Sequence, residues 1–323
     1  MQYCQEVFPV LARLVEAFSD FTPILERVCR CWRNMVLSYR SGMIPLLPQL
    51  AEILASGFTT SRQGCFLWAT DSIVREFSSG AEHVDNSTSD AIFNFFEQQT
   101  VTFLTALNDL TPDDLPDVIE DFFRLGIDVL LYYPLKTLSC ELIKPILSAA
   151  SSSLTLQKAE PLMSTLHFLR DFIAYGTEHN PSSSLDQSNG NGHGNPPEVQ
   201  AAVKQILVEQ GEVLTQRIMT GMMYTFPRDC LPDASGVLLG LFQVIPPQAA
   251  QWLAATISML PAGSVSPQES ERLQRNIGQF VQQGDPRKIR TLLQDFTNSY
   301  RRRNVAPREG LGRLEATRFR FAQ

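Results

Sequence analysis

Apolar residues recur at steps of three and four positions along most of this chain, and the strict alternation that is typical of half-buried strands is scarce. This pattern predicts an all-α protein, because residues three and four apart share one face of a helix. Most prolines fall where a helix is expected to start or a turn to form. The predicted helices span residues 3–18, 22–40, 43–57, 63–78, 88–108, 115–132, 136–150, 157–176, 197–225, 231–244, 246–260, 266–283 and 286–302.

Consecutive helices are expected to pair as hairpins, and short segments echo one another along the chain. Residues 8–11 (FPVL) resemble 44–47 (IPLL), residues 115–118 (LPDV) resemble 231–234 (LPDA), and residues 168–172 (FLRDF) resemble 292–296 (LLQDF). Imperfect repeats of about 40 residues are typical of a HEAT-type α-solenoid, in which each hairpin buries its apolar face against the next. The sequence therefore predicts a HEAT-repeat stack over residues 1–302, and a single globular helical bundle is the alternative.

Two segments depart from the helical pattern. Residues 178–197 are rich in Gly, Ser, Asn and Pro, so they are expected to form a mobile loop with too little apolar burial to offset the entropy of ordering. Residues 301–323 hold seven Arg against two Glu, whereas the whole chain has a formal net charge of −7. We expect residues 303–323 to form a basic, disordered tail beyond the stack.

No catalytic, metal-binding or cofactor-binding pattern stands out in the sequence. The six cysteines lack the C-x-x-C spacing of zinc sites, and the four histidines are scattered. The glycine-rich residues 190–194 lie in a polar tract, which favours a linker over a phosphate-binding loop. No apolar run approaches the roughly 20 residues that a membrane helix needs. We therefore expect no metal, no cofactor, no membrane partner and no enzymatic activity, with free thiols in a reducing compartment.

The most informative stretch is the predicted helix over residues 22–40, which Thr22 is expected to cap with Pro23 in the first turn. On a wheel of about 100° per residue, Glu26, Arg30, Arg33 and Arg40 fall within roughly 80° of one another. The opposite face is apolar and is expected to be buried. The residues that the wheel places on this face are Ile24, Leu25, Val28, Cys31, Trp32, Met35, Val36 and Tyr39.

This charged ridge has two interpretations. It is either an ordinary solvated face, in which Glu26 supports the helix through Arg30, or a binding surface. The second is favoured because the ridge holds Arg without Lys, and a guanidinium group binds phosphate or carboxylate in a bidentate manner. Leu37, an apolar residue in the middle of the ridge, also suggests a surface that meets a partner. Direct nucleic-acid binding needs a wider basic surface with aromatic residues, which this acidic chain does not indicate.

Several stretches together resemble the transportin-SR branch of the importin-β superfamily and its fungal nuclear-import-receptor counterparts. They occur in the family's order between residue 1 and about residue 302, and they correspond to roughly the last third of such receptors, so a partial chain is expected. The matching stretches are residues 26–33 (ERVCRCWR), 65–77 (CFLWATDSIVREF), 117–125 (DVIEDFFRL), 168–173 (FLRDFI), 231–244 (LPDASGVLLGLFQV) and 251–253 (QWL).

The resemblance implies a HEAT-repeat karyopherin that shuttles between cytoplasm and nucleus, contacts nucleoporins and releases its cargo on binding Ran-GTP. Family members carry arginine/serine-rich splicing and mRNA-binding proteins on a helix that presents one glutamate and three arginines. Glu26, Arg30 and Arg33 match the first three of these positions, but Leu37 stands at the last one. Arg40 is a candidate extension that belongs to this chain alone. The departure at Leu37 makes a cargo with arginine/glycine or sparsely phosphorylated segments an alternative.

Four further interpretations accompany this one. The main Ran-GTP site is expected in the N-terminal repeats of such receptors, outside this chain. The acidic residues 109–121 are expected to form a turn and a helix start, and within the transport hypothesis they could meet the cargo's arginines. A helical-repeat scaffold without Ran-dependent release is the alternative function, and RNA binding by residues 301–323 ranks third.

Overall fold

The computed structural model describes residues 2–78, 84–178 and 194–305, and every regular element within them is a helix. By their internal contacts the residues divide into two compact units, Met1–Ala202 and Val203–Gln323. The all-α prediction is confirmed. Most of the predicted loop, residues 179–193, and residues 306–323 of the predicted tail lie outside the described part of the chain.

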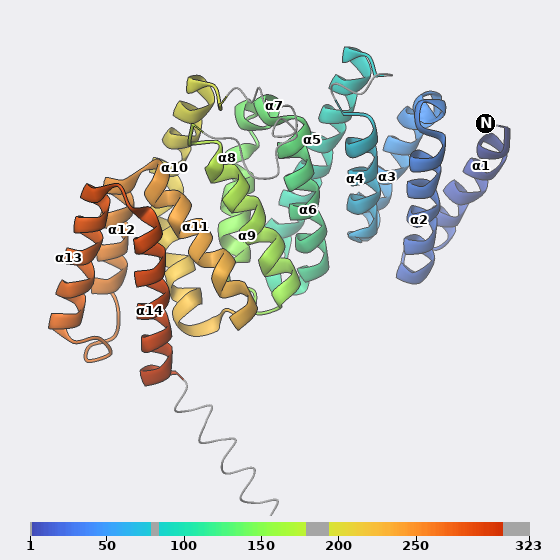
Figure 1. Cartoon of the computed structure of the whole chain (residues 1–323). Coiled ribbons are helices and arrows are strands. Elements are labelled where there is room, and N and C mark those ends of the chain that lie inside the picture. The colour runs from blue at the N-terminus through green and yellow to red at the C-terminus, as the bar shows by residue number, and fades with distance from the viewer. Residues whose placement is uncertain (1, 79–83, 179–193, 306–323) are drawn as a thin grey trace, which may run out of the picture. The chain divides into compact units, whose positions relative to one another are not determined.

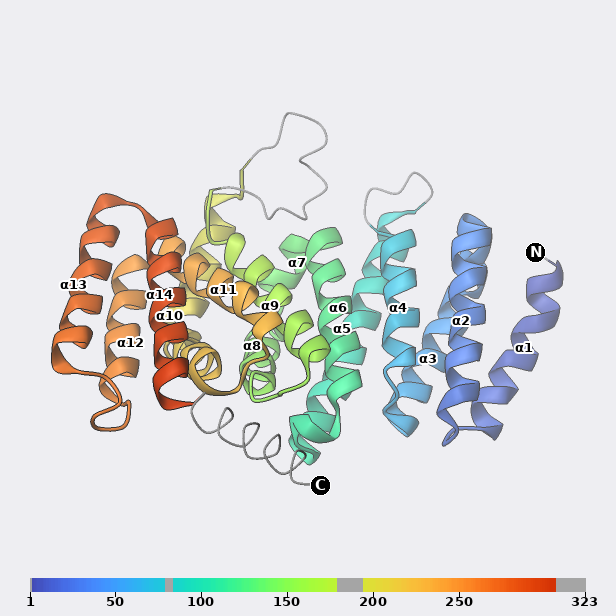
Figure 2. The same cartoon turned by 60° about the horizontal axis from the view of Figure 1, so that its bottom comes forward.

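Helices of the first unit stack in two layers (Figures 1 and 2). In the first layer α1 packs against α3, α3 against α5, and α5 against α8, while in the second layer α2 packs against α4, α4 against α6, and α6 against α9. Contacts between α1 and α2, between α3 and α4, and between α8 and α9 join the layers as hairpins. This arrangement is the one that the HEAT-type repeats predicted.

Within each layer, successive helices start between 39 and 57 residues apart. The first layer consists of α1 (Gln2–Ala17), α3 (Leu47–Ser61), α5 (Asn86–Asp109) and α8 (Ile143–Ser153). The second layer consists of α2 (Thr22–Tyr39), α4 (Cys65–Glu76), α6 (Pro116–Tyr132) and α9 (Ala159–Ala174). Short elements join them, namely η1 (Arg40–Leu46), η2 (Pro112–Asp114) and α7 (Pro134–Ser139).

Two local predictions were wrong. The helix predicted over residues 136–150 is two helices, α7 and α8, separated at Cys140, which has an extended backbone with ψ of 149°. Pro145 explains the break, because its ring would clash with the carbonyl of residue 141 if the helix continued through that residue. The helix predicted from residue 43 begins at Leu47, after the 3₁₀ turns of η1.

A continuous row of aromatic rings joins the layers of the first unit. Phe103 of α5 stacks on Phe122 of α6, with ring centroids 3.7 Å apart. Phe122 meets Phe123 edge to face at 5.4 Å, and Phe123 lies 5.2 Å from Phe168 of α9. All four rings are buried. Since each buried aromatic side chain contributes a few kcal/mol, these contacts make one hydrophobic core of several hairpins.

Gly57 of α3 allows the ring of Phe66 in α4 to come close. A Cβ atom at this position would lie 2.4 Å from Cε1 of the fully buried Phe66. We expect Gly57→Ala to lower the free energy of unfolding by about 1–2 kcal/mol, because the overpacking exceeds the gain in helix propensity. Gly236→Ala is the matched control: a Cβ there meets nothing within 4 Å, so its stability should be unchanged or higher. Denaturant unfolding of both variants measures this, and equal effects would contradict the packing account.

The second unit also consists of helices that pack against one another in pairs. Within it α11 packs against α12 and α14, and α13 packs against α12 and α14. Its elements are α10 (Pro197–Thr220, which begins in the first unit), the π-helical turn η4 (Gly221–Thr225), η5 (Arg228–Cys230), α11 (Leu231–Val244), α12 (Pro246–Ser258), α13 (Pro267–Gln283) and α14 (Pro286–Asn304).

The three pairs of similar sequence segments differ in how well they mark the helical repeat. The LPD segments mark the starts of α6 and α11, and the segments 168–172 and 292–296 lie within α9 and α14. Pro9, however, lies inside α1, whereas Pro45 lies in η1 before α3. The first of the three echoes is therefore wrong as a marker of the repeat.

Candidate functional site

Helix α2 carries most of the predicted charged ridge. Its apolar side is buried against α1 and α4, with Leu25, Val28, Trp32 and Val36 inaccessible to solvent. The helix starts without a side-chain cap, because Phe21 occupies the N-cap position and Thr22 is already helical. The prediction that Thr22 caps the helix is thus wrong.

The wheel misplaced two residues of α2, because Cys31 and Tyr39, which it put on the buried face, are exposed. Cys29, which it did not put on that face, is fully buried. The reason is that α2 has a neighbour on each side, and the contact with α4 buries Cys29 beside Cys65, the first residue of that helix. The hydrogen bond with Cys65, together with burial, raises the pKa of the Cys29 thiol, which therefore stays protonated at neutral pH.

Three of the four predicted cargo residues lie together on the exposed side of α2. Glu26, Arg30 and Arg33 are all exposed, and Leu37, 44% exposed, follows them along the same side. No ion pair engages Arg30 within the described residues. Its guanidinium group is therefore available to an anionic partner.

Arg40 occupies a different position from the one that the wheel gave it. Helix α2 ends at Tyr39, and Arg40 adopts a φ of 44°, so the helical progression stops before it. Its Nε lies 3.4 Å from Oε1 of Glu76 in α4, and its side chain is 72% exposed. The extrapolation of the wheel to residue 40 is wrong, and a role of Arg40 in cargo binding stays a prediction.

A cluster of charges on α4 and α6 lies beside the ridge. Arg75 Nη1 is 3.8 Å from Oδ2 of Asp71 and 3.7 Å from Oδ2 of Asp128 on α6. Burial, followed by the neighbouring Asp128, raises the pKa of Asp71 to about 8, against the opposing charges of Arg75 and Arg33. Because two close carboxyl groups cannot both ionise easily, Asp71 holds a proton at neutral pH and leaves Arg33 without a full counter-charge.

A second acidic group lies nearer the start of α6. Burial, followed by the charge of Glu120, raises the pKa of Asp121 to about 7, and Glu26 of α2 adds to the rise. Glu120 itself pairs with Arg124 at 2.6 Å. Glu26 of the ridge therefore belongs to an acidic area that α6 continues, next to the arginines of α2.

Two further acids of the stretch 109–121 have structural roles. Asp109 accepts a bond from Arg62 at 2.7 Å, and Asp114 forms a capping box with Thr111 around η2. The predicted turn and helix start are confirmed. Only Asp117, Glu120 and Asp121 lie on α6, where they could meet a ligand bound beside the ridge.

Sequence reasoning missed the Asp71–Arg75–Asp128 cluster. Asp71 and Arg75 stand four residues apart within the stretch 65–77, which is a signal for one helix face. Their partner Asp128 belongs to the next repeat, and no spacing rule within one helix predicts that contact. Among the described residues no group of His, Cys, Asp and Glu could hold a metal ion, and none of the described helices combines the length and apolarity of a membrane span.

Comparisons with known proteins point to one family. Residues 1–104 match the family described as the Transportin-3/Importin-13 fourth TPR domain. An uncharacterised protein of Schizosaccharomyces pombe is 32% identical over 311 residues, which cover 95% of this chain and 32% of that relative. The mRNA transport regulator MTR10 of Saccharomyces cerevisiae is 25% identical, with 88% of this chain and 30% of the relative covered.

A solved structure supports the fold. The chain described as importin13 in its cytosolic state matches with a TM-score of 0.73 at 16% identity, covering 93% of this chain and 31% of that one. This likeness shows a helical-repeat solenoid. The chain spans about a third of the length of the curated relatives it matches.

Proposed function

We propose that this chain, which belongs to the importin-β superfamily and to its transportin-SR branch, binds an extended cargo segment through Glu26, Arg30, Arg33 and Arg40. The observation that carries the proposal is the exposed side of α2, where Glu26, Arg30 and Arg33 lie together and Arg30 has no ion-pair partner among the described residues. Members of this family are transport receptors and not enzymes.

The cargo chemistry follows from the side chains of the ridge. Charge-assisted hydrogen bonds to a guanidinium group are about twice as strong as neutral ones, and a phosphoserine adds a charge of about −2. Phosphoserine or acidic residues of the cargo would bind Arg30 and Arg33, while the cargo's own arginines would lie beside Glu26 and the acids of α6. An arginine/serine-rich segment offers both kinds of charge in alternation.

The wider proposal is nuclear import of arginine/serine-rich or related mRNA-binding proteins. It includes Ran-GTP-dependent release, contact with nucleoporins, and shuttling between cytoplasm and nucleus. Its support is the family, together with one fungal relative named as an mRNA transport regulator and others named importin-13. The ridge supplies the cargo-binding part, and the rest is drawn from the family alone.

The proposal is tested by fluorescence anisotropy with a labelled arginine/serine peptide in phosphorylated and unphosphorylated forms. We expect the chain to bind the phosphorylated form about tenfold more tightly, because each phosphate can take a bidentate contact. Binding that is absent for both peptides would reject the cargo proposal. Tighter binding of an unphosphorylated arginine/glycine peptide would favour the other cargo class.

Release by Ran-GTP separates a transport receptor from a scaffold. The full-length protein is captured with its bound cargo from its own cells, and Ran-GTP is added to the complex. A receptor is expected to lose its cargo into the supernatant, with Ran-GDP as the control. Cargo that stays bound under both conditions would favour the helical-repeat scaffold.

Leu37 offers a gain-of-function test of the ridge. Leu37→Arg places a guanidinium group four residues after Arg33 on the same exposed side. We expect it to raise the affinity for a multiply phosphorylated peptide by about three- to tenfold. Leu37→Lys is the matched control, and it should gain less because an ammonium group cannot bind phosphate in a bidentate manner. Equal affinity in all three proteins would mean that the cargo does not reach residue 37.

A further inference from the structure

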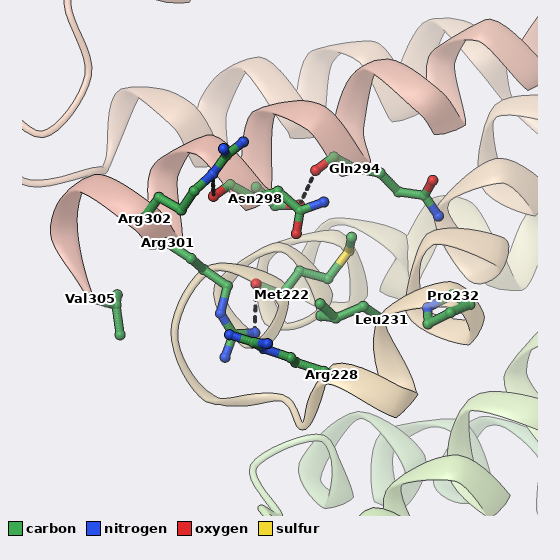
Figure 3. Close-up of a pocket in the computed structure, with 10 residues that line it drawn as sticks. Met222, Arg228, Leu231, Pro232, Gln294, Asn298, Arg301, Arg302 and Val305 are labelled. Atoms are coloured by element: carbon green, nitrogen blue, oxygen red, sulfur yellow. Dashed lines mark hydrogen bonds between the residues drawn. The ribbon is translucent and has the colours of Figure 1, made fainter. Parts of the chain in front are cut away.

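A cavity of about 570 Å³ lies within the second unit. Side chains reach it from α14, from the η4–η5 segment and from the start of α11 (Figure 3). Its walls combine four apolar residues with donors of hydrogen bonds. The lining residues are Met222, Arg228, Leu231, Pro232, Gln294, Thr297, Asn298, Arg301, Arg302 and Val305.

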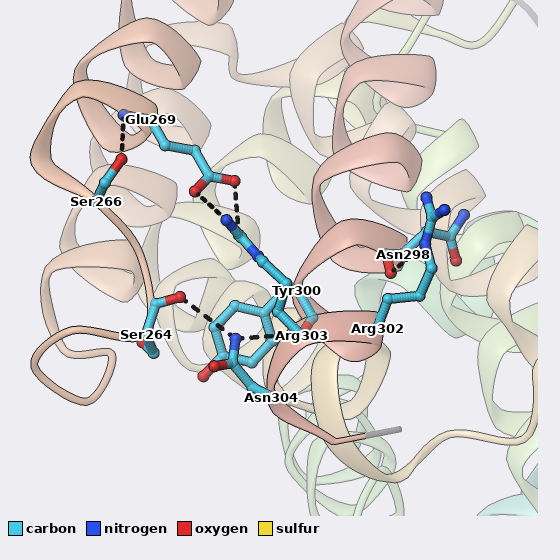
Figure 4. A network of polar contacts seen from close by, with 8 residues as sticks. All are labelled: Ser264, Ser266, Glu269, Asn298, Tyr300, Arg302, Arg303 and Asn304. Atoms are coloured by element: carbon cyan, nitrogen blue, oxygen red, sulfur yellow. Dashed lines mark hydrogen bonds and ion pairs between the residues drawn. The ribbon is translucent and has the colours of Figure 1, made fainter. Parts of the chain in front are cut away.

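The charge of this cavity is wholly positive. Arg228, Arg301 and Arg302 line it without any carboxylate, and Asp229 and Asp233, although near in sequence, are not among the lining residues. No ion pair engages these three arginines within the described part of the chain. Arg303, the next residue, differs because both its terminal nitrogens bind Glu269, at 2.9 and 2.7 Å (Figure 4).

The wall of the cavity is fixed by specific contacts. Arg301 Nη1 donates to the carbonyl oxygens of Met222 and Phe226, at 3.3 and 2.9 Å. The hydroxyl groups of Tyr224 and Tyr300 are hydrogen-bonded, with their rings edge to face and centroids 5.3 Å apart. Met222 and Tyr224 belong to η4, a π-helical turn, and such turns are rare and frequently found at functional sites.

The hydrogen-bond donors that line the cavity indicate which class of ligand it would bind. Three guanidinium groups and the Asn298 amide offer more donors than the two oxygens of one carboxylate can accept, whereas phosphate brings three oxygens and about two negative charges. None of the lining residues is aromatic, although proteins that bind single-stranded nucleic acids stack the bases on aromatic rings. A phosphorylated peptide therefore fits the cavity better than RNA.

We infer that this cavity is a phosphate-binding site for a phosphoserine-bearing peptide segment, separate from the ridge on α2. Arg228 and the two terminal nitrogens of Arg302 supply the guanidinium donors, while the Nε of Arg302 donates to the Asn298 carbonyl oxygen at 3.5 Å. Arg301 adds charge from a position that its carbonyl contacts hold. Leu231, Pro232 and Val305 would pack against the peptide on either side of the phosphate. The inference depends on this cavity alone and is independent of the import function proposed above.

The test measures anisotropy of a labelled, neutral Gly/Ser peptide with two phosphoserines. It uses the full chain carrying Arg30→Glu and Arg33→Glu, so that the ridge does not contribute. We expect the phosphorylated peptide to bind about tenfold more tightly than its unphosphorylated form. Arg228→Glu with Arg302→Glu should lower that affinity by about tenfold or more. The control pair Arg272→Glu and Arg275→Glu, exposed on α13, makes the same charge change away from the cavity and should alter it less than about twofold.

Three results would overturn the inference. The first is equal binding of phosphorylated and unphosphorylated peptides, and the second is an equal loss in the control pair, which would indicate non-specific attraction. The third is tighter binding of a single-stranded RNA of the same charge that depends on Arg228 and Arg302, or of a peptide with glutamates at the same positions. A melting temperature within about 2 °C of the parent's, measured for every variant, shows that each has folded.

Discussion

Replacing Arg30 and Arg33 together by glutamate should lower the affinity for a phosphorylated arginine/serine peptide by about 100-fold. Each substitution removes a charge-assisted hydrogen bond of about 1.5–3 kcal/mol and adds repulsion. Both side chains are exposed on α2, so the melting temperature should change little. Anisotropy titration at fixed ionic strength measures the affinity, because surface charge contacts weaken as salt rises.

The control for this pair is again Arg272→Glu with Arg275→Glu, since it makes the same change in net charge on exposed residues of α13. We expect less than about a twofold effect from it. If the ridge variant binds as tightly as the parent, the cargo site is not on α2. If both pairs lose binding equally, the peptide responds to the total charge of the protein and not to a defined ridge.

The fold and the location of the ridge could be predicted because they depend on local rules. Three- and four-residue periodicity gave the helices, and short repeats indicated hairpin stacking. The exposed positions of Glu26, Arg30 and Arg33 follow from one helix alone, since their spacing places them opposite Trp32 and its apolar neighbours.

Contacts between repeats could not be predicted in the same way. Cys29 is buried because α4 lies beside it, and Arg40 leaves the ridge because the backbone turns after Tyr39 and Glu76 is within reach. Asp71 and Asp128 stand far apart in sequence and meet only when α4 packs on α6. A helical wheel describes one cylinder, and these features depend on what surrounds it.

Among the described carboxyl groups of the second layer, Asp71 has the most strongly raised pKa. Its side chain is 19% exposed, and its pKa is raised to about 8 by burial and by Asp128, whereas an unfolded aspartate has a pKa of about 3.9. A raised pKa in the folded state contributes stability that is complete below the unfolded pKa and is lost as the pH rises through the folded one. Since one pKa unit corresponds to about 1.4 kcal/mol, the free energy of unfolding should fall by roughly 2–5 kcal/mol between pH 5 and pH 9.

Asp71→Asn should remove much of this fall. At pH 5 the variant and the parent should agree within about 1 kcal/mol, and at pH 9 the variant should be more stable by roughly 2 kcal/mol or more, because the buried site no longer ionises. Denaturant unfolding at a series of pH values measures this, with Asp113→Asn as the exposed control. An identical fall in the Asp71 variant would show that the titrating group lies elsewhere. Asp121, whose pKa is also raised, to about 7, would then be the next residue to replace.

The same carboxyl group connects stability to the proposed function. While Asp71 is protonated, it does not attract the guanidinium group of Arg33, which can therefore bind a cargo phosphate. An ionised Asp71 would compete with that phosphate for Arg33. Peptide affinity should therefore fall between pH 7 and pH 9 in the parent and fall less in Asp71→Asn, while a serine phosphate, with a second pKa of about 6, stays fully charged throughout this range. A parallel decline in both proteins would separate Asp71 from the ridge and confine its role to the packing of α4 on α6.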